Sequence, residues 1–105
     1  MLVIIESPYA GEVARNKRYL QRCILDCITR GESPYASHQM LTEALDDTNP
    51  AERELGIKAG FRWRAVADKT VVYEDYGISS GMRYGILDSK ALGKPVEYRR
   101  IGSTD

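Results

Sequence analysis

Apolar residues recur along the chain with two different periods, and the two periods alternate. Short apolar or β-branched runs predict strands, and the run at Leu2–Ile5 is typical of a strand that is buried on both faces of a parallel sheet. Apolar residues three and four positions apart predict amphipathic helices. The predicted strands cover residues 2–5, 33–37, 69–74 and 96–100, and the predicted helices cover about residues 12–30, 40–45, 50–66 and 80–92.

This order of elements predicts one α/β domain over residues 1–105. Strands and helices alternate with short links, and right-handed crossovers then give a small doubly wound sheet of about four parallel strands with helices on both faces. Ligands of such sheets bind at the carboxyl ends of the strands, at the point where the strand order reverses. We therefore expect the site between the loop after the first strand and the loop after the third.

The start of the predicted helix over residues 50–66 is clearly marked. Asn49 can cap it, Pro50 suits its first position, and Glu52 stands where a capping box places an acid. The residues expected to face the core from this helix are Leu55, Ala59, Trp63 and Val66.

Composition narrows the range of partners. The 15 basic and 15 acidic residues balance, which removes the electrostatic case for nucleic-acid binding. No apolar run has membrane-spanning length, and residues 1–6 are too short for the core of a signal peptide, so a cytoplasmic protein without a membrane partner is expected. Cys23 and Cys27 are expected to be buried reduced thiols. With a single His and no ligand spacing, neither a metal nor another cofactor is predicted.

The stretch Gly77–Gly85 carries the strongest local signal for a ligand. It follows a β-branched strand and opens a helix, an arrangement that presents unpaired backbone N–H groups to an anion. Ser79 or Ser80 can cap this helix. Arg83 lies in the first turn, where a cation opposes the helix dipole, so it is either simply solvated or directed at an anionic ligand.

Four segments together resemble a known family. Residues 3–11, 67–72, 81–83 and 91–96 occur in the order of the nucleoside 2-deoxyribosyltransferase-like superfamily, and they are most similar to its small bacterial and bacteriophage members. The resemblance extends from about residue 2 to residue 100. It implies a flavodoxin-like or Rossmann-like sheet, a pocket for a nucleoside or nucleotide, and a homo-oligomer in which neighbouring subunits complete each other's sites.

The resemblance also locates a missing residue. Transferases of this family use a Glu in the first turns of the helix after the third strand as the nucleophile. In the pattern Gly-x-x-x-Glu that begins at Gly81, the Glu position falls on Gly85. A carboxylate is needed there because it stabilises or traps an oxocarbenium-like transition state. Asp88 and Asp75 are the nearest acids that could replace it.

The resemblance implies binding residues after the first two strands. Ser7, Pro8 and Tyr9 match the loop that contacts base and sugar, where Tyr9 either stacks on a base or packs on a neighbouring subunit. Asp68 matches the acid of an Ala-Asp pair in the family, or is only a turn residue. His38 follows the second strand at its carboxyl end, and we expect it to bind ligand rather than to act in catalysis.

Further binding residues are expected after the third strand. Glu74 or Asp75 either accepts hydrogen bonds from ribose hydroxyls or belongs to a solvated loop. The residues expected around a phosphate are Ser79, Ser80, Gly81, Met82 and Arg83, with Arg83 supplying the charge.

Three functions fit these features. The first is a nucleoside- or nucleotide-binding protein that lacks the catalytic Glu and that, in a bacteriophage, would sequester a nucleotide signal as an anti-defence protein. The second is an enzyme that cleaves or transfers an N-glycosidic bond with Asp88 or Asp75 as the carboxylate. The third is an interaction protein that kept only the fold. Arg83→Ala should weaken a phosphorylated ligand under the first function and have no effect under the third.

Overall fold

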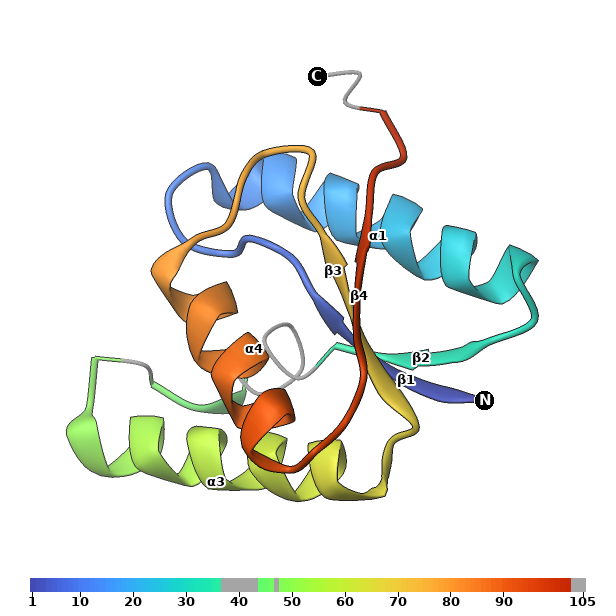
Figure 1. Cartoon of the computed structure of the whole chain (residues 1–105). Helices are drawn as coiled ribbons and strands as arrows, with labels where there is room; N and C mark the ends of the chain where they lie inside the picture. The colour runs from blue at the N-terminus through green and yellow to red at the C-terminus, as the bar shows by residue number, and fades with distance from the viewer. Residues whose placement is uncertain (37–43, 47, 103–105) are drawn as a thin grey trace.

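The computed structural model describes residues 1–36, 44–46 and 48–102 of the chain. Its elements follow each other as β1 (Leu2–Glu6), α1 (Val13–Thr29), β2 (Ser33–Tyr35), α3 (Pro50–Val66), β3 (Lys69–Tyr73), α4 (Ser80–Ala91) and β4 (Val96–Arg99) (Figure 1). The helical turns predicted at residues 40–45 lie largely outside the described residues.

The four strands form one parallel sheet with the order β2-β1-β3-β4. The predicted doubly wound, flavodoxin-like or Rossmann-like α/β sheet is thereby confirmed. β1 and β3 are the two central strands, and Glu6 at the end of β1 is in register with Val72 near the end of β3. The loops that follow these two strands are therefore neighbours at the carboxyl edge of the sheet, where ligands of such folds bind (Figure 1).

The two faces of the sheet bury different helices. Alternate residues of a strand point to opposite faces, so Val3 and Ile5 pack with Val71 against α1, in a core cluster that also holds Cys23 and Cys27. On the opposite face, Val72 packs against Met82 and Ile86 of α4. α3 lies beside α4 on that second face, as the hydrogen bond from Arg64 of α3 to Ser89 of α4 requires (Figure 1).

The predicted helix starts are confirmed in most details. The side chain of Asn49 accepts hydrogen bonds from the N–H groups of Ala51 and Glu52, at 3.0 and 3.3 Å, and Pro50 takes the first position. The reciprocal half of a capping box does not form, because the carboxylate of Glu52 accepts instead from the N–H of Asp46. Ser79 caps α4 by accepting from the N–H of Met82.

The prediction for the core-facing side of α3 was wrong. Leu55, Trp63 and Val66 are 59%, 46% and 63% exposed, and the buried residues of this helix are Gly60 and Arg64. Successive residues of a helix point about 100° apart, so burying Arg64 moves Trp63 out of the core to the side of the helix, where its ring packs on Tyr35 of β2 with the ring centres 4.7 Å apart. The partner of Arg64 explains this rotation, since its guanidinium forms a buried ion pair with Glu6 of β1.

Candidate functional site

Gly85, at the position expected for a catalytic Glu, has no room for a side chain. A Cβ atom built there would overlap Oε2 of Glu6 and would lie 2.6 Å from Nη2 of Arg64. Glu6 comes from the end of β1 and Arg64 from α3, and the side chains of both are only 7% exposed. A carboxylate is therefore present beside position 85, but it belongs to a strand and is already paired.

A buried polar network holds this ion pair in place. Nη1 of Arg64 donates to the hydroxyls of Thr70 and Ser89, each at 3.3 Å. The two hydroxyls lie 2.6 Å apart, and Ser89 also donates to the backbone carbonyl of Gly85 at 3.0 Å. The network thus joins β1, α3, β3 and α4 behind the carboxyl edge of the sheet, and the donors of Arg64 are shared among Glu6, Thr70 and Ser89.

Burial makes the carboxyl group of Glu6 easier to protonate. Its pKa is raised above the usual value, because loss of water disfavours the carboxylate more than the positive charge of Arg64 favours it. The negative charge of Asp88, one turn beyond Gly85 on α4, raises the pKa further. Asp88 is half-buried. Two acids and one arginine therefore lie close together around Gly85.

The loop after β1 is firmly attached to the start of α1. Ser7 and Pro8 are buried, and Tyr9 is half-buried. The buried side chain of Asn16 donates to the carbonyls of Tyr9 and Ala10, at 2.9 and 3.2 Å. These bonds fix the backbone at Tyr9, the last of the three residues that the family resemblance assigns to base and sugar.

Arg15 and Tyr76 connect this loop to the one after β3. The guanidinium of Arg15 lies 4.0 Å from the ring centre of Tyr76 and also donates to the side-chain oxygen of Asn16. The hydroxyl of Tyr76 is buried and has no hydrogen-bond partner within the described part of the chain. A buried hydroxyl without a partner is uncommon, and this one lies between the two loops of the carboxyl edge.

The two acids after β3 have different surroundings. The carboxylate of Asp75 accepts from Tyr19 at 2.5 Å and from the N–H groups of Ile101 and Gly102. Burial raises the pKa of Asp75, but these hydrogen bonds together bring it below its usual value. Glu74 is half-buried and accepts one bond from the exposed Arg100 at 3.3 Å. Asp75 is therefore occupied in anchoring the C-terminal residues, and Glu74 remains the more accessible acid.

The start of α4 presents a mixed set of residues. The hydroxyl of Ser79 is used in the cap, and the side chain of Met82 is buried in the core under α4. Ser80 and Gly81 are exposed. Arg83 is exposed as well, and among the described residues it makes no hydrogen bond or ion pair. The backbone of the first turn and the Arg83 side chain are thus free to meet an anion.

Two expected binding residues do not join this group. Asp68 precedes β3 at the amino edge of the sheet, opposite the candidate site, and its carboxylate accepts from the N–H of Leu2 at 2.6 Å. His38 lies outside the described residues. Most of the other expected binding residues do come together at the carboxyl edge of the sheet, namely Ser7, Pro8, Tyr9, Glu74, Asp75, Ser79, Ser80, Gly81 and Arg83.

The sequence pattern missed Glu6, Arg64, Arg15 and Tyr76. The first two carry a recognisable signal, since Glu6 closes an otherwise apolar strand and Arg64 interrupts the apolar end of a helix. Their pairing across 58 positions has no local signature. The contact between Arg15 and Tyr76 likewise depends on how two distant loops meet.

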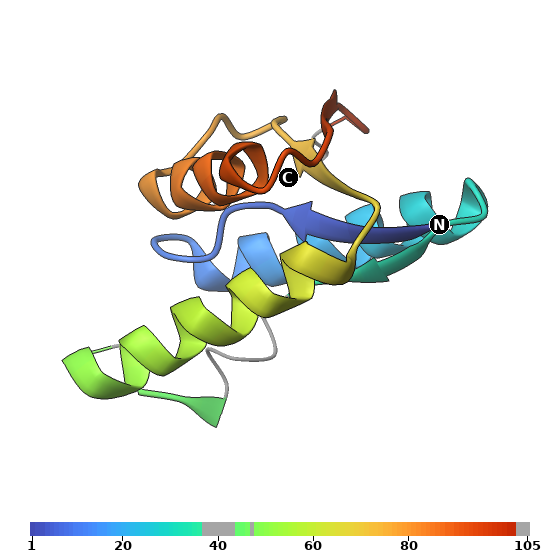
Figure 2. The ribbon, with the colours of Figure 1, turned by 60° about the horizontal axis from the view of Figure 1, so that its bottom comes forward.

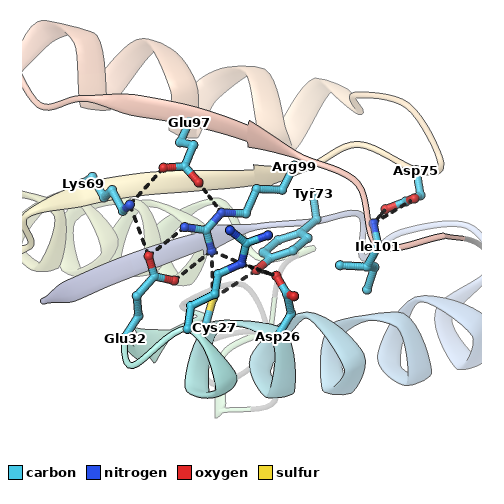
Figure 3. Close-up of polar contacts among 10 residues, drawn as sticks. Asp26, Cys27, Glu32, Lys69, Tyr73, Asp75, Glu97, Arg99 and Ile101 are labelled. Atoms are coloured by element: carbon cyan, nitrogen blue, oxygen red, sulfur yellow. Dashed lines mark hydrogen bonds and ion pairs between the residues drawn. The ribbon is translucent and has the colours of Figure 1, made fainter.

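A second buried network lies on the α1 face of the sheet, away from these residues. Arg99 of β4 donates to both carboxylate oxygens of Glu32, at 2.7 and 2.6 Å, and to the hydroxyl of Tyr73 at 3.1 Å. Lys69 binds Glu32 and Glu97, at 3.1 and 2.9 Å, and Arg99 also pairs with Glu97 (Figure 3). The hydrogen bonds from Arg99 hold the pKa of Glu32 down at about 2.

The described part of the chain contains neither a cluster of metal-ligating side chains nor a membrane-spanning helix. Among those residues, no three His, Cys, Asp or Glu side chains gather as metal ligands would. None of the described helices has the length and apolar character needed to cross a membrane. Cys23 and Cys27 are free and buried, as predicted.

The fold is shared with two proteins that have been solved. The 2-deoxyribosyltransferase of Bacillus psychrosaccharolyticus matches with a TM-score of 0.68 and 17% identity, over 100% of this chain and 77% of that one. The CMP N-glycosidase of Clostridium botulinum matches with a TM-score of 0.59 and 16% identity, over 95% of this chain and 69% of that one. In fold, both agree with the predicted superfamily resemblance.

Sequence comparison assigns the chain to a family. No curated protein matches it. A family model described as "Domain of unknown function (DUF7768)" matches residues 1–99. Since this match spans nearly the whole sequence, the chain belongs to the DUF7768 family.

Proposed function

We propose that this protein binds a nucleoside or nucleotide at the carboxyl edge of its sheet and leaves the N-glycosidic bond intact. The observation that carries the proposal is the state of position 85. Gly85 provides no carboxylate, and the space that its side chain would need is filled by the ion pair of Glu6 and Arg64. A carboxylate that is buried and neutralised by an arginine is poorly suited to attack a sugar carbon.

The ligand class follows from the fold and from the residues at this edge. One protein of similar fold is a 2-deoxyribosyltransferase used to make nucleosides, and the other is a CMP N-glycosidase. In this chain, Tyr9 would stack on the base, and the carboxylate of Glu74 would accept hydrogen bonds from the ribose hydroxyls. The first turn of α4, with Ser80, Gly81 and Arg83, would bind a phosphate.

A protein that retains such a ligand without cleaving it acts by sequestration. In a bacteriophage, sequestering a nucleotide signal would block a host defence that depends on it. The protein would do this as a homo-oligomer, which the family resemblance implies.

A second candidate, cleavage or transfer of an N-glycosidic bond, is favoured by one observation. Oε2 of Glu6 occupies the space where a side chain at position 85 would begin. The carboxylate would then reach the sugar from β1 instead of from α4, and its raised pKa would suit an acid–base role. Asp88 is the next acid on the same helix, whereas Asp75 is already held by Tyr19 and two backbone N–H groups.

One experiment separates the two candidates. The pure protein is incubated with nucleosides, nucleotides, dinucleotides and cyclic nucleotides, and the free and protein-bound fractions are analysed by chromatography after denaturation. An intact compound in the bound fraction, with no free base anywhere, is the result expected. Free base or a new ribosyl product would overturn the binding-only proposal, and loss of that product in Glu6→Gln but not in Asp88→Asn would identify the carboxylate.

The phosphate contact has its own test. Arg83→Ala should weaken a phosphorylated ligand by about 1–3 kcal/mol in binding free energy, because a charge-assisted hydrogen bond is lost. Lys90→Ala is the matched control, since Lys90 is exposed at the opposite end of α4 and should leave affinity unchanged. Equal affinities of the wild type and Arg83→Ala, measured by titration calorimetry, would remove Arg83 from the site.

A further inference from the structure

Glu6 uses only one of its two carboxylate oxygens inside the protein. Oε2 pairs with Nη2 of Arg64, whereas Oε1 makes no hydrogen bond among the described residues. In that part of the chain, the only fully covered side-chain nitrogen or oxygen without a partner is the hydroxyl of Tyr76. Oε1 of Glu6 is therefore not fully covered, although the side chain as a whole is only 7% exposed. A buried carboxylate thus keeps one oxygen open to a group from outside.

This oxygen lies at the edge of the sheet where we place the ligand. Glu6 is the last residue of β1, and its side chain points to the same face of the sheet as that of Val72, the face that α4 covers. Figure 2 shows this arrangement, with α4 (orange) on one side of β1 (dark blue) and α1 (light blue) on the other. Oε2 fills the space beside Gly85 where a side chain would begin. The carboxylate of Glu6 is therefore next to the position expected for a catalytic Glu.

The sugar of a nucleoside limits what Oε1 can meet at this position. A catalytic Glu at position 85 would face the anomeric carbon, which carries no hydrogen-bond donor. The neighbouring carbon, C2′, carries a hydroxyl group in ribose but only hydrogens in 2′-deoxyribose. A carboxylate oxygen accepts hydrogen bonds and does not donate them. Oε1 therefore matches the 2′-hydroxyl of ribose, and it finds no donor at C2′ of a deoxyribose.

We propose that Glu6 accepts a hydrogen bond from the 2′-hydroxyl of the ligand and thereby makes the site select ribose over 2′-deoxyribose. This role rests on the proposed function, which puts the sugar beside Gly85. A deoxyribose would displace water from Oε1 without replacing its hydrogen bond, and that loss is the source of the selectivity. Arg64 is a positioning residue, because its bonds to Thr70 and Ser89 fix the guanidinium that holds Oε2.

The test compares the ribose and 2′-deoxyribose forms of one nucleotide. The pure protein is titrated in a calorimeter with the 5′-monophosphates of the common nucleosides, each in both sugar forms. The wild type should bind the ribose form of its preferred nucleotide at least about tenfold more tightly, as the loss of one hydrogen bond to a charged acceptor predicts. A purely structural role of Glu6 predicts no difference between the two sugars.

A double variant tests whether Glu6 is the cause. Removing Glu6 alone would leave Arg64 buried without a counter-ion, so Glu6→Met is combined with Arg64→Met. Proteins often tolerate the exchange of a buried ion pair for apolar side chains, and the circular-dichroism spectrum should be unchanged. The ratio of the two affinities should fall to near one through weaker binding of the ribose form. Asp68→Asn, at the opposite edge of the sheet, is the matched control and should keep the wild-type ratio.

Two results would overturn this role of Glu6 while leaving the proposed function intact. One is equal affinity of the wild type for both sugar forms of the nucleotide that it binds. The other is a preference for ribose that persists in the folded double variant. If the wild type binds no nucleotide in either sugar form, the result counts against the proposed function, and the role of Glu6 falls with it.

Discussion

Two buried arginines bind glutamates on opposite faces of the same sheet, and the two glutamates respond in opposite directions. Glu32 receives both arms of Arg99 and a further bond from Lys69, and its pKa falls to about 2. Glu6 receives a single nitrogen of Arg64, and burial raises its pKa. Burial is the larger influence on the pKa of Glu6, whereas hydrogen bonds from Arg99 are the larger influence on the pKa of Glu32.

The difference separates a network that stabilises from a pair that is costly to bury. The Arg99 cluster satisfies its charges with several partners and ties β4 to β3 and to the residue before β2 (Figure 3). The Glu6–Arg64 pair is less well compensated and lies directly beside the candidate site. Residues that lower the stability of a protein are expected near its functional sites. Glu6, a buried acid beside Gly85, is such a residue.

Breaking the better network should have the largest effect. Arg99→Met leaves Glu32 and Glu97 buried or half-buried with only Lys69, and we expect a loss of about 3–5 kcal/mol in the free energy of unfolding. Urea denaturation measures this loss. The neighbouring Arg100→Met is the control, because Arg100 is exposed and bonds Glu74 at only 3.3 Å, so its effect should stay within about 0.5 kcal/mol. Similar losses for both variants would contradict the role given to Arg99.

Filling position 85 should have a smaller effect. Gly85→Ala forces a methyl group into the Glu6–Arg64 pair, and overpacking of about 1–3 kcal/mol outweighs the helix preference of Ala. Gly81→Ala on the same helix is the control, since its nearest neighbour is 4.0 Å away, and it should not destabilise. In a Glu6→Ala background the penalty of Gly85→Ala should largely vanish. An unchanged penalty there would show that Glu6 is not what excludes a side chain.

The smallest effect expected is a dependence of stability on pH. The pKa of Glu32 is lowered in the folded state, so its contribution is complete above the unfolded value of 4.5 and is lost as pH falls towards 2. Between pH 7 and pH 4 the wild type should lose roughly 1 kcal/mol through this group. Glu32→Gln should lack that part of the slope when unfolding is measured at several pH values. Parallel slopes for the two proteins would refute the assignment.

The fold could be predicted from the sequence because it depends on local periods. Each strand and helix described here was expected within about two residues, the cap at Asn49 follows from residue type alone, and Ser79 is one of the two serines expected to cap the last helix. The exposed side of α3 could not be predicted this way. Leu55, Trp63 and Val66 have the spacing of a core face, and only the distant Glu6 explains why Arg64 takes the inward position.

For the candidate site, likewise, the positions of the loops could be predicted from the sequence and the roles of single residues could not. The loops were placed correctly because the strand order brings the ends of β1 and β3 together. The roles of single residues depended on long-range contacts instead: Asp75 is bound by Tyr19 and by the C-terminal backbone, and Asp68 lies at the opposite edge. Glycine at position 85 was visible from the sequence, but the carboxylate that fills its space was not.

The charges of Arg99 and Glu97 have a further consequence, because β4 is the last strand on its side of the sheet. A charged residue that points inward from an outer strand makes it costly for a foreign strand to pair there and bury that face. On the other outer strand, Pro34 has no N–H to donate to an added strand. Both borders of the sheet are thus protected against the addition of a foreign strand, the first step of strand-by-strand aggregation.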